Sequence, residues 1–223
     1  MCGRFMLATP REELVTRFRL QHALALGPRY NIAPGQPVAA VRESGERGRE
    51  LVLLHWGLVP HWTKDPNSGN KMINARAETL AQKPSFRAAF GRRRCLLPAD
   101  GFYEWKALNG RKQPYSIRSK DRRPFALAGL WEHWENQTTV IESCTIITTT
   151  ANELLRPLHE RMPVILAEED YDRWLDCSNQ DPQTLQHLLR PYDPNQLIAY
   201  PVSTRVNSPK NDDSECIAPI ESE

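Results

Sequence analysis

The sequence has 223 residues, 40% of them hydrophobic and 25% charged, with a formal net charge of +2. This composition is ordinary for a soluble globular protein, and the length suits one domain, 2–223, built around one core. It excludes a membrane-spanning helix, because no apolar run approaches roughly 20 residues, and the N-terminus lacks the apolar stretch of a secretory signal. We therefore expect a cytoplasmic protein, and so small a net charge does not by itself indicate a nucleic-acid-binding protein.

The first residues, MCGRF, place a cysteine directly after the initiator methionine. Removal of Met1 would leave Cys2 with a free α-amine and a thiol on adjacent carbons. An idle thiol at a frayed chain end is the alternative interpretation. The five cysteines are scattered without metal-ligand spacing, so we expect no metal, no cofactor and no disulfide framework, and inert core thiols at Cys95 and Cys144.

In chain order, the first predicted element is a helix from Thr9 to about Leu20, which begins with a capping-box pattern and a proline. Residues 30–37 (YNIAPGQP) are expected to form an ordered loop, and residues 51–58 a buried strand. Residues 75–90 look helical but are interrupted by a proline. Four arginines lie close together in this region and form either a local basic surface or a solvated run of charges: Arg87, Arg92, Arg93 and Arg94.

The middle of the chain is rich in predicted strands. Two strands flank Asn109-Gly110, a strong hairpin signal, and two more cover residues 125–131 and 140–149. Two short helices are predicted within residues 171–189, and the tail after about Asp213 is expected to be loose. Because strands dominate the centre without regular βαβ alternation, we predict an α+β fold, a single domain with a largely antiparallel, partly barrel-like β core flanked by short helices.

Two short stretches carry polar residues suited to chemistry. MINARAET places Asn74, Arg76 and Glu78 at alternate positions, and LHERMPVIL sets His159 and Arg161 ahead of an apolar strand. The arginines either grip phosphates or pair with local carboxylates. The histidine is either an acid, base or hydrogen-bond donor near neutral pH or a structural side chain.

A third stretch, DGFYEWK, places Glu104 among aromatic residues in a predicted strand. Partial loss of solvent would raise the pKa of this carboxyl into the range useful for proton transfer. The alternative is an exposed glutamate paired with a lysine. In WGLVPHW, Trp56 is expected in the core, whereas Trp62 lies in a loop and is better placed to stack on a base.

Eight stretches together resemble one family. MCGRF, YNIAPGQ, WGLVPHW, MINARAET, CLLPADGFYEWK, AGLW, HERMPVIL and PVSTRVNSPKND occur in the order seen in the SRAP family of SOS-response-associated peptidases, which are abasic-site processing proteins. The resemblance runs from Cys2 to about Asp213. It implies covalent capture of abasic sites in single-stranded DNA, with Cys2, Asn74, Glu104 and His159 as catalytic residues and Gly3, Arg4, Trp62, Arg76, Thr148 and Arg161 as DNA contacts.

The implied chemistry explains the position of the cysteine. A ring-opened abasic sugar presents an aldehyde. An α-amine has a pKa of about 7.7–8.0, against about 10.4 for lysine, so far more of it is reactive free base at neutral pH. Its attack gives an imine, which the neighbouring thiol closes into a thiazolidine. In this scheme Glu104 moves protons, His159 hydrogen-bonds the sugar hydroxyl and Asn74 orients the amine or the sugar. Strand cleavage by β-elimination is an expected side activity.

Three other functions compete with this interpretation. A glutamine amidotransferase, or another N-terminal-cysteine amidohydrolase, would use the Cys2 thiol on an amide and release ammonia from glutamine. An autoprocessing protease would remove Met1 or a short propeptide. A non-covalent DNA-binding module would form only a reversible complex. For the preferred function we expect single-stranded abasic DNA as the partner, a monomer, no membrane, and association with the nucleoid when the protein is bound to DNA.

Overall fold

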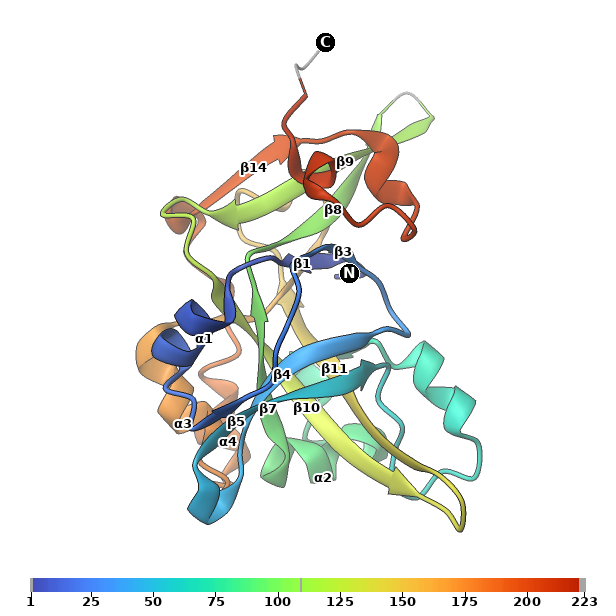
Figure 1. Ribbon diagram of the computed structural model, residues 1–223, viewed down its shortest axis with the longest axis vertical. Coiled ribbons are helices and arrows are strands. Elements are labelled where there is room, and N and C mark those ends of the chain that lie inside the picture. Colours follow the sequence, from blue (N-terminus) through green and yellow to red (C-terminus); the bar gives the residue numbers. More distant parts are fainter. Residues whose placement is uncertain (1, 109, 221–223) are drawn as a thin grey trace.

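The computed structural model describes residues 2–108 and 110–220. Within this part of the chain, five strands form one sheet, the upper part of the molecule in Figure 1. Their order across the sheet is β14 (Leu197–Pro201), β9 (Arg111–Ser119), β8 (Gly101–Leu108), β1 (Phe5–Leu7) and β3 (Arg29–Ile32).

The second sheet forms a barrel. Its order is β12 (Arg161–Pro163), β11 (Val140–Thr150), β10 (Phe125–Glu135), β7 (Arg94–Ala99), β4 (Pro37–Glu43), β5 (Arg49–Trp56) and β2 (His22–Ala23), with β13 (Ile165–Leu166) on β10 and β6 (Asn74–Arg76) on β11. Strand β11 also pairs with β5, which closes β11, β10, β7, β4 and β5 into a ring. Most pairings are antiparallel, so the predicted α+β fold with a partly barrel-like core is confirmed.

Short helices flank this barrel (Figure 1). They are α1 (Arg11–Phe18), α2 (Pro84–Arg92), α3 (Tyr171–Leu175) and α4 (Pro182–Gln186). Phe18 of α1 stacks on Tyr171 of α3 with ring centroids 5.5 Å apart, and Phe90 of α2 lies 6.3 Å from Trp174 of α3. Helices α1, α2 and α3 therefore bury aromatic side chains against one another, and α2 and α3 also pack on the barrel. No helix of the described residues is long and apolar enough to cross a membrane.

Two predicted helices differ from those observed. The predicted capping box at Thr9 is wrong, because its backbone N–H and hydroxyl bond to the Asp100 carboxylate and the helix begins only at Arg11. The helix predicted from residue 75 is also wrong at its start. Residues 74–76 pair with β11 instead, and α2 begins at Pro84, where the missing N–H of proline costs no helical hydrogen bond.

One long path links the two sheets. Strand β7 of the barrel runs through Asp100 directly into β8 of the upper sheet, and β8 turns back into β9 across the predicted hairpin. Leu108 pairs with Arg111 there, and Asn109 lies outside the described residues. Gly101 marks the change of sheet, since a Cβ on it would lie 2.5 Å from the Ile117 carbonyl oxygen. Only glycine allows β8 and β9 to approach so closely.

The four neighbouring arginines do not form one surface. Arg94 is buried and donates to backbone carbonyls of Phe90, Gly91, Trp174, Asp176 and Asn179, so it is a structural side chain that ties α2 to α3 and the loop after it. Arg93 donates to the buried Glu132 carboxylate. The basic surface that the sequence allowed is therefore reduced to the remaining arginines of α2, Arg87 and Arg92.

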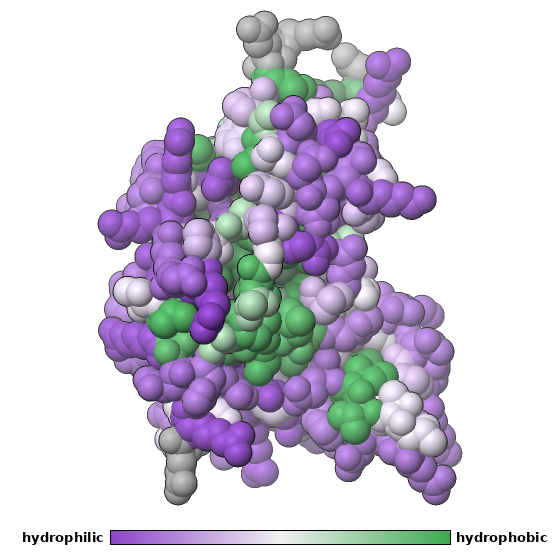
Figure 2. All heavy atoms as spheres, in the orientation of Figure 1, coloured by the Kyte–Doolittle hydropathy of each residue, from purple (hydrophilic) through white to green (hydrophobic). Residues whose placement is uncertain are grey.

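The C-terminal segment packs on the upper sheet. Asp212 accepts from the backbone N–H groups of Tyr30 and Asn31 at 2.5 and 2.8 Å, and Val202 bridges to Pro219. Residues up to 220 are thus tied to the fold, in contrast to the loose tail expected from its polar composition. Figure 2 shows polar side chains over most of one face, with an apolar patch near β4 and β5, where Leu53 is partly exposed.

Candidate active site

The site lies where the first residues of the chain run between the two sheets. Phe5 of β1 pairs with Phe102 of β8, and the backbone N–H of Tyr103 donates to the Arg4 carbonyl at 3.0 Å. Continuing this antiparallel register brings Glu104 opposite the residue that follows Cys2. The carboxylate and the N-terminal cysteine, about a hundred positions apart in sequence, are therefore neighbours.

Cys2 is completely buried, with 0% of its surface exposed. Burial raises the pKa of its thiol, and the negative charge of Glu104 raises it further, so the thiol stays protonated at neutral pH. Asn74 of β6 donates from Nδ2 to the Cys2 carbonyl oxygen at 2.8 Å. The other amide atom, Asn74 Oδ1, is buried and has no hydrogen-bond partner among the described residues, which leaves an acceptor beside Cys2.

Glu104 is 4% exposed. Burial raises the pKa of its carboxyl from 4.5 to about 7, because the charged form loses its water. The rise that the aromatic surroundings predicted is therefore present. A carboxyl with this pKa exists in both protonation states near neutral pH, as an acid–base catalyst requires.

His159 has one defined tautomer when it is neutral. Its Nδ1 accepts from the backbone N–H of Arg161 at 2.9 Å, so the proton of the neutral ring is on Nε2. Burial lowers the pKa of this imidazole, which favours the neutral form. The side chain is thus set to donate a hydrogen bond from Nε2 at neutral pH.

A pocket with a volume of about 530 Å³ opens beside these groups. Its lining contains Glu104 and His159 together with Trp105, Lys112 and Asn207. The Trp105 Nε1 donates to Asn207 Oδ1 at 2.7 Å. Trp105, Lys112 and Asn207 were not predicted as site residues, although the stretches DGFYEWK and PVSTRVNSPKND contain Trp105 and Asn207.

The three arginines expected to contact DNA differ in their surroundings. Arg76 is exposed, and no ion pair to it is found within the described ranges. Arg4 is half-buried and donates from Nη1 to Asn31 Oδ1 at 2.7 Å and to the Val206 carbonyl at 2.6 Å. Arg161 pairs with Glu78 through both terminal nitrogens, at 2.6 and 3.0 Å.

The remaining predicted contacts are less uniform. Gly3 is partly buried beside Cys2, and Thr148 is fully buried with its hydroxyl 3.4 Å from the Ala75 carbonyl oxygen. Trp62 is 56% exposed, as expected for a stacking residue, whereas Trp56 is in the core. The loop of Trp62 is held against β10 by two hydrogen bonds, from the His61 backbone N–H to the Glu132 carboxylate and from Trp134 Nε1 to the Thr63 carbonyl oxygen.

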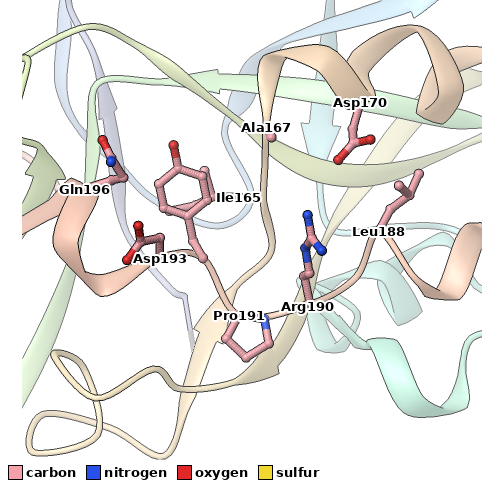
Figure 3. A pocket seen from close by; sticks show the side chains of 9 residues that line it. Ile165, Ala167, Asp170, Leu188, Arg190, Pro191, Asp193 and Gln196 are labelled. Atoms are coloured by element: carbon pink, nitrogen blue, oxygen red, sulfur yellow. The ribbon is translucent and has the colours of Figure 1, made fainter.

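A second cavity, of about 310 Å³, lies elsewhere on the molecule, between residues 165–170 and 188–196 (Figure 3). Asp170 and Arg190 are on its wall, and none of the predicted site residues lines it. Among the described residues, no group of three or more histidine, cysteine and acidic side chains could hold a metal ion. The pocket beside Glu104 therefore remains the candidate active site.

Comparison with known proteins gives a consistent family. Residues 1–209 match the model of the SOS response associated peptidase (SRAP) family. Abasic site processing protein YoqW of Bacillus subtilis is 47% identical over 97% of this chain and 99% of its own length. Abasic site processing protein HMCES of Gallus gallus is 34% identical over 87% of this chain and 67% of its own. A crystal structure of a Bacteroides thetaiotaomicron protein superposes with a TM-score of 0.89 at 27% identity, covering 99% of this chain and all of that one.

Proposed function

The chain belongs to the SOS response associated peptidase family, and we propose that it captures abasic sites in single-stranded DNA as a covalent crosslink through Cys2. The observation that carries the proposal is the placement of Cys2 beside a buried carboxyl with a pKa of about 7 and an amide oxygen that lacks a partner among the described residues. The abasic site processing proteins that the chain resembles supply the substrate class. The crosslink would shield the lesion.

The reaction needs the α-amine that removal of Met1 exposes. This amine adds to the C1′ aldehyde of the ring-opened sugar, and the resulting carbinolamine loses water to give an imine. The Cys2 thiol then adds to the imine carbon, and its proton passes to the nitrogen, which closes a five-membered thiazolidine. One water is released overall, and no oxidant, metal or cofactor takes part.

Glu104 fits both proton transfers. As the acid, its carboxyl protonates the departing hydroxyl of the carbinolamine, and as the base, its carboxylate takes the proton of the thiol. The raised pKa of the Cys2 thiol supports this order of events, because a buried neutral thiol is a weak nucleophile until a base removes its proton. The amine therefore attacks first and the thiol second.

Asn74 and His159 hold the reactants. Asn74 fixes the Cys2 carbonyl through Nδ2, and its buried Oδ1 is available to accept a hydrogen bond from the freed α-amine. His159 donates from Nε2 to the sugar hydroxyl that ring opening releases, which favours the open aldehyde form. In the same scheme an imine at C1′ acidifies the C2′ proton, so slow strand cleavage accompanies capture.

The proposal is tested by blocking the amine alone. A protein with an uncleaved tag before Cys2 keeps the thiol, Glu104, His159 and the arginines, but its amine is an amide. We expect tagged and untagged proteins to bind abasic DNA similarly, while intact-mass analysis finds a denaturation-resistant adduct, lighter by one water than the sum of its parts, only for the untagged form. A full yield of adduct with the tag still attached would show that the α-amine is not the nucleophile.

Cys2→Ser separates the two nucleophiles of the same residue. The serine variant retains the amine and can form an imine, but it lacks the thiol that closes the ring. We expect borohydride to trap a complex with this variant and heating without borohydride to release the DNA. A heat-stable adduct of wild-type yield would contradict ring closure by the thiol.

A further inference from the structure

Glu78 belongs to the MINARAET stretch but has no place in the chemistry above. Its carboxylate forms a two-pronged ion pair with Arg161, in which Nη1 lies 2.6 Å from Oε1 and Nη2 lies 3.0 Å from Oε2. We propose that this carboxylate occupies the phosphate-binding fork of Arg161 in the DNA-free protein and is displaced by a DNA phosphate, so that Glu78 sets the affinity and the salt dependence of DNA binding. The inference rests on the proposed function.

The pair spans the end of a barrel strand. Strand β6 lies on one edge of β11, where Arg76 pairs with Thr148, and β12 lies on the other edge, where Arg161 pairs with Thr150. Glu78 follows β6 directly, in the short 3-10 helix Ala77–Thr79, and so reaches across β11 to Arg161. The contact joins residues 83 positions apart at the rim of the candidate site.

While Glu78 is bound to it, the guanidinium of Arg161 has few donors accessible to another anion. Besides the two bonds to the carboxylate, Nη2 donates to the Thr148 carbonyl at 2.7 Å, and Nε is buried. The Arg161 side chain is 12% exposed, whereas that of Glu78 is 48% exposed. Carboxylate and phosphate fit the same arginine fork, so a phosphate reaches Arg161 by replacing its more exposed partner, Glu78.

The other charges of the site support displacement. Arg161 is the strongest influence on Glu78, lowering the pKa of its carboxyl, and Arg76 lowers it further, so Glu78 is ionised at every pH at which DNA binding would be measured. A carboxylate that remained on Arg161 beside a bound phosphate would repel it.

Exchange of one anion for another has a definite salt signature. A phosphate neutralised on a single strand contributes about 0.7 to the slope of log affinity against log salt, through release of condensed cations. The carboxylate freed from Arg161 attracts cations from the buffer, which offsets that release. We therefore expect Arg161 to add little to the slope in the wild type and its full share when residue 78 is neutral.

The experiment measures binding without chemistry. Fluorescence anisotropy with a single-stranded oligonucleotide carrying a tetrahydrofuran abasic analogue, which has no aldehyde, is recorded over a range of salt concentrations. The variants are Glu78→Gln, Arg161→Ala, their combination, and Glu160→Gln as a charge control. Glu160 is exposed and precedes Arg161 directly in sequence, and within the described ranges it forms no ion pair with it. Thermal unfolding of each variant checks the fold.

We expect Glu78→Gln to bind about two- to fivefold more tightly near physiological salt, the free energy of a partly exposed ion pair, and to steepen the slope by about 0.7. Arg161→Ala should remove this steepening in the Glu78→Gln background and change the slope little alone. Glu160→Gln should leave the slope unchanged. Weaker binding or an unchanged slope in folded Glu78→Gln would overturn the inference and make Glu78 a structural brace.

Failure of this inference differs from failure of the proposed function. If the wild type crosslinks an aldehyde-bearing oligonucleotide but Glu78→Gln shows no change in slope, only the displacement of Glu78 is refuted. If the wild type neither binds the analogue nor crosslinks the aldehyde, the proposed function fails and this inference fails with it.

Discussion

The ionised form of Glu104 that would serve as a base destabilises the folded protein. Its folded-state pKa of about 7 lies above the ordinary 4.5 of a glutamate, so the fold prefers the protonated carboxyl. That preference stabilises the protein fully below about pH 4.5 and is lost as the pH rises through about 7. We expect Glu104→Gln, which does not titrate, to gain stability relative to the wild type between about pH 5 and pH 8.5, by up to about 3 kcal/mol. Chemical denaturation at the two pH values measures this, and an equal difference at both would contradict the raised pKa.

The same substitution should slow the chemistry. A positioned acid or base contributes about 10²–10⁴-fold, so crosslinking by Glu104→Gln should fall by a factor in that range while affinity for the aldehyde-free analogue stays near that of the wild type. Quenched time courses of the denaturation-resistant adduct give the rate. A variant that loses affinity and rate together would place Glu104 in DNA binding rather than in proton transfer.

In the proposed mechanism His159 hydrogen-bonds the sugar hydroxyl and takes no part in the proton transfers of the amine. Because the same imine lies on the path in both directions, His159→Ala should slow formation and reversal of the crosslink alike and leave the final yield nearly unchanged. Reversal is followed by chasing the preformed adduct with an excess of unlabelled abasic DNA. A variant that slows formation only would require another role for the Nε2 proton.

The C-terminal segment is an element that helps to build the site. Buried Asn31 donates from Nδ2 to backbone carbonyls of Val206, Ser208 and Asn211, and its Oδ1 accepts from Arg4. Asn31→Ala removes these bonds and leaves buried polar groups unpaired, so we expect a loss of about 2–3 kcal/mol in the free energy of unfolding. Denaturant titration measures the loss. Asn195→Ala, at an exposed position, is the matched control and should cost under about 0.5 kcal/mol.

Elements specified by their own residues could be predicted from the sequence. The hairpin around Gly110 needs only a two-residue turn between strands, and both α3 and α4 fall within the predicted helical region. Residues 74–76 could not be predicted, because their state is decided by pairing with β11, some 70 residues away. The closure of the barrel by β11 on β5 has the same non-local cause.

The candidate site also has residues that could be predicted from the sequence and contacts that could not. That Cys2 and Glu104 belong to one site could be predicted, since MCGRF and DGFYEWK contain them and the family resemblance brings them together; the chemistry between them stays a prediction. The partner of Arg161 could not, because only the barrel places Glu78 across β11 from it. The sequence also does not show that Arg94 donates its hydrogen bonds to backbone carbonyls, some of them more than 80 residues away, and so does not contribute to a basic surface.

The whole molecule places Cys2, the proposed nucleophile, between its two sheets. Cys2 is fully buried, and the pocket beside Glu104 and His159 measures about 530 Å³, room for a sugar but not for a duplex. With a net charge of only +2, the protein has little long-range attraction for DNA, so the proposed binding would depend on local contacts from its arginines.

This geometry predicts selectivity for unpaired DNA. To reach Cys2, an abasic sugar in an intact duplex must leave the stack together with its flanking nucleotides, at a cost of a few kcal/mol, or about 10²-fold in rate. We expect capture to be that much faster on a single strand than on a fully paired duplex carrying the same lesion, with a duplex gapped opposite the lesion in between. Initial rates of adduct formation at equal, subsaturating DNA concentration make the comparison. Equal rates on all three substrates would mean that the sugar reaches Cys2 without entering the recess, and the site described here would not be the one that reacts.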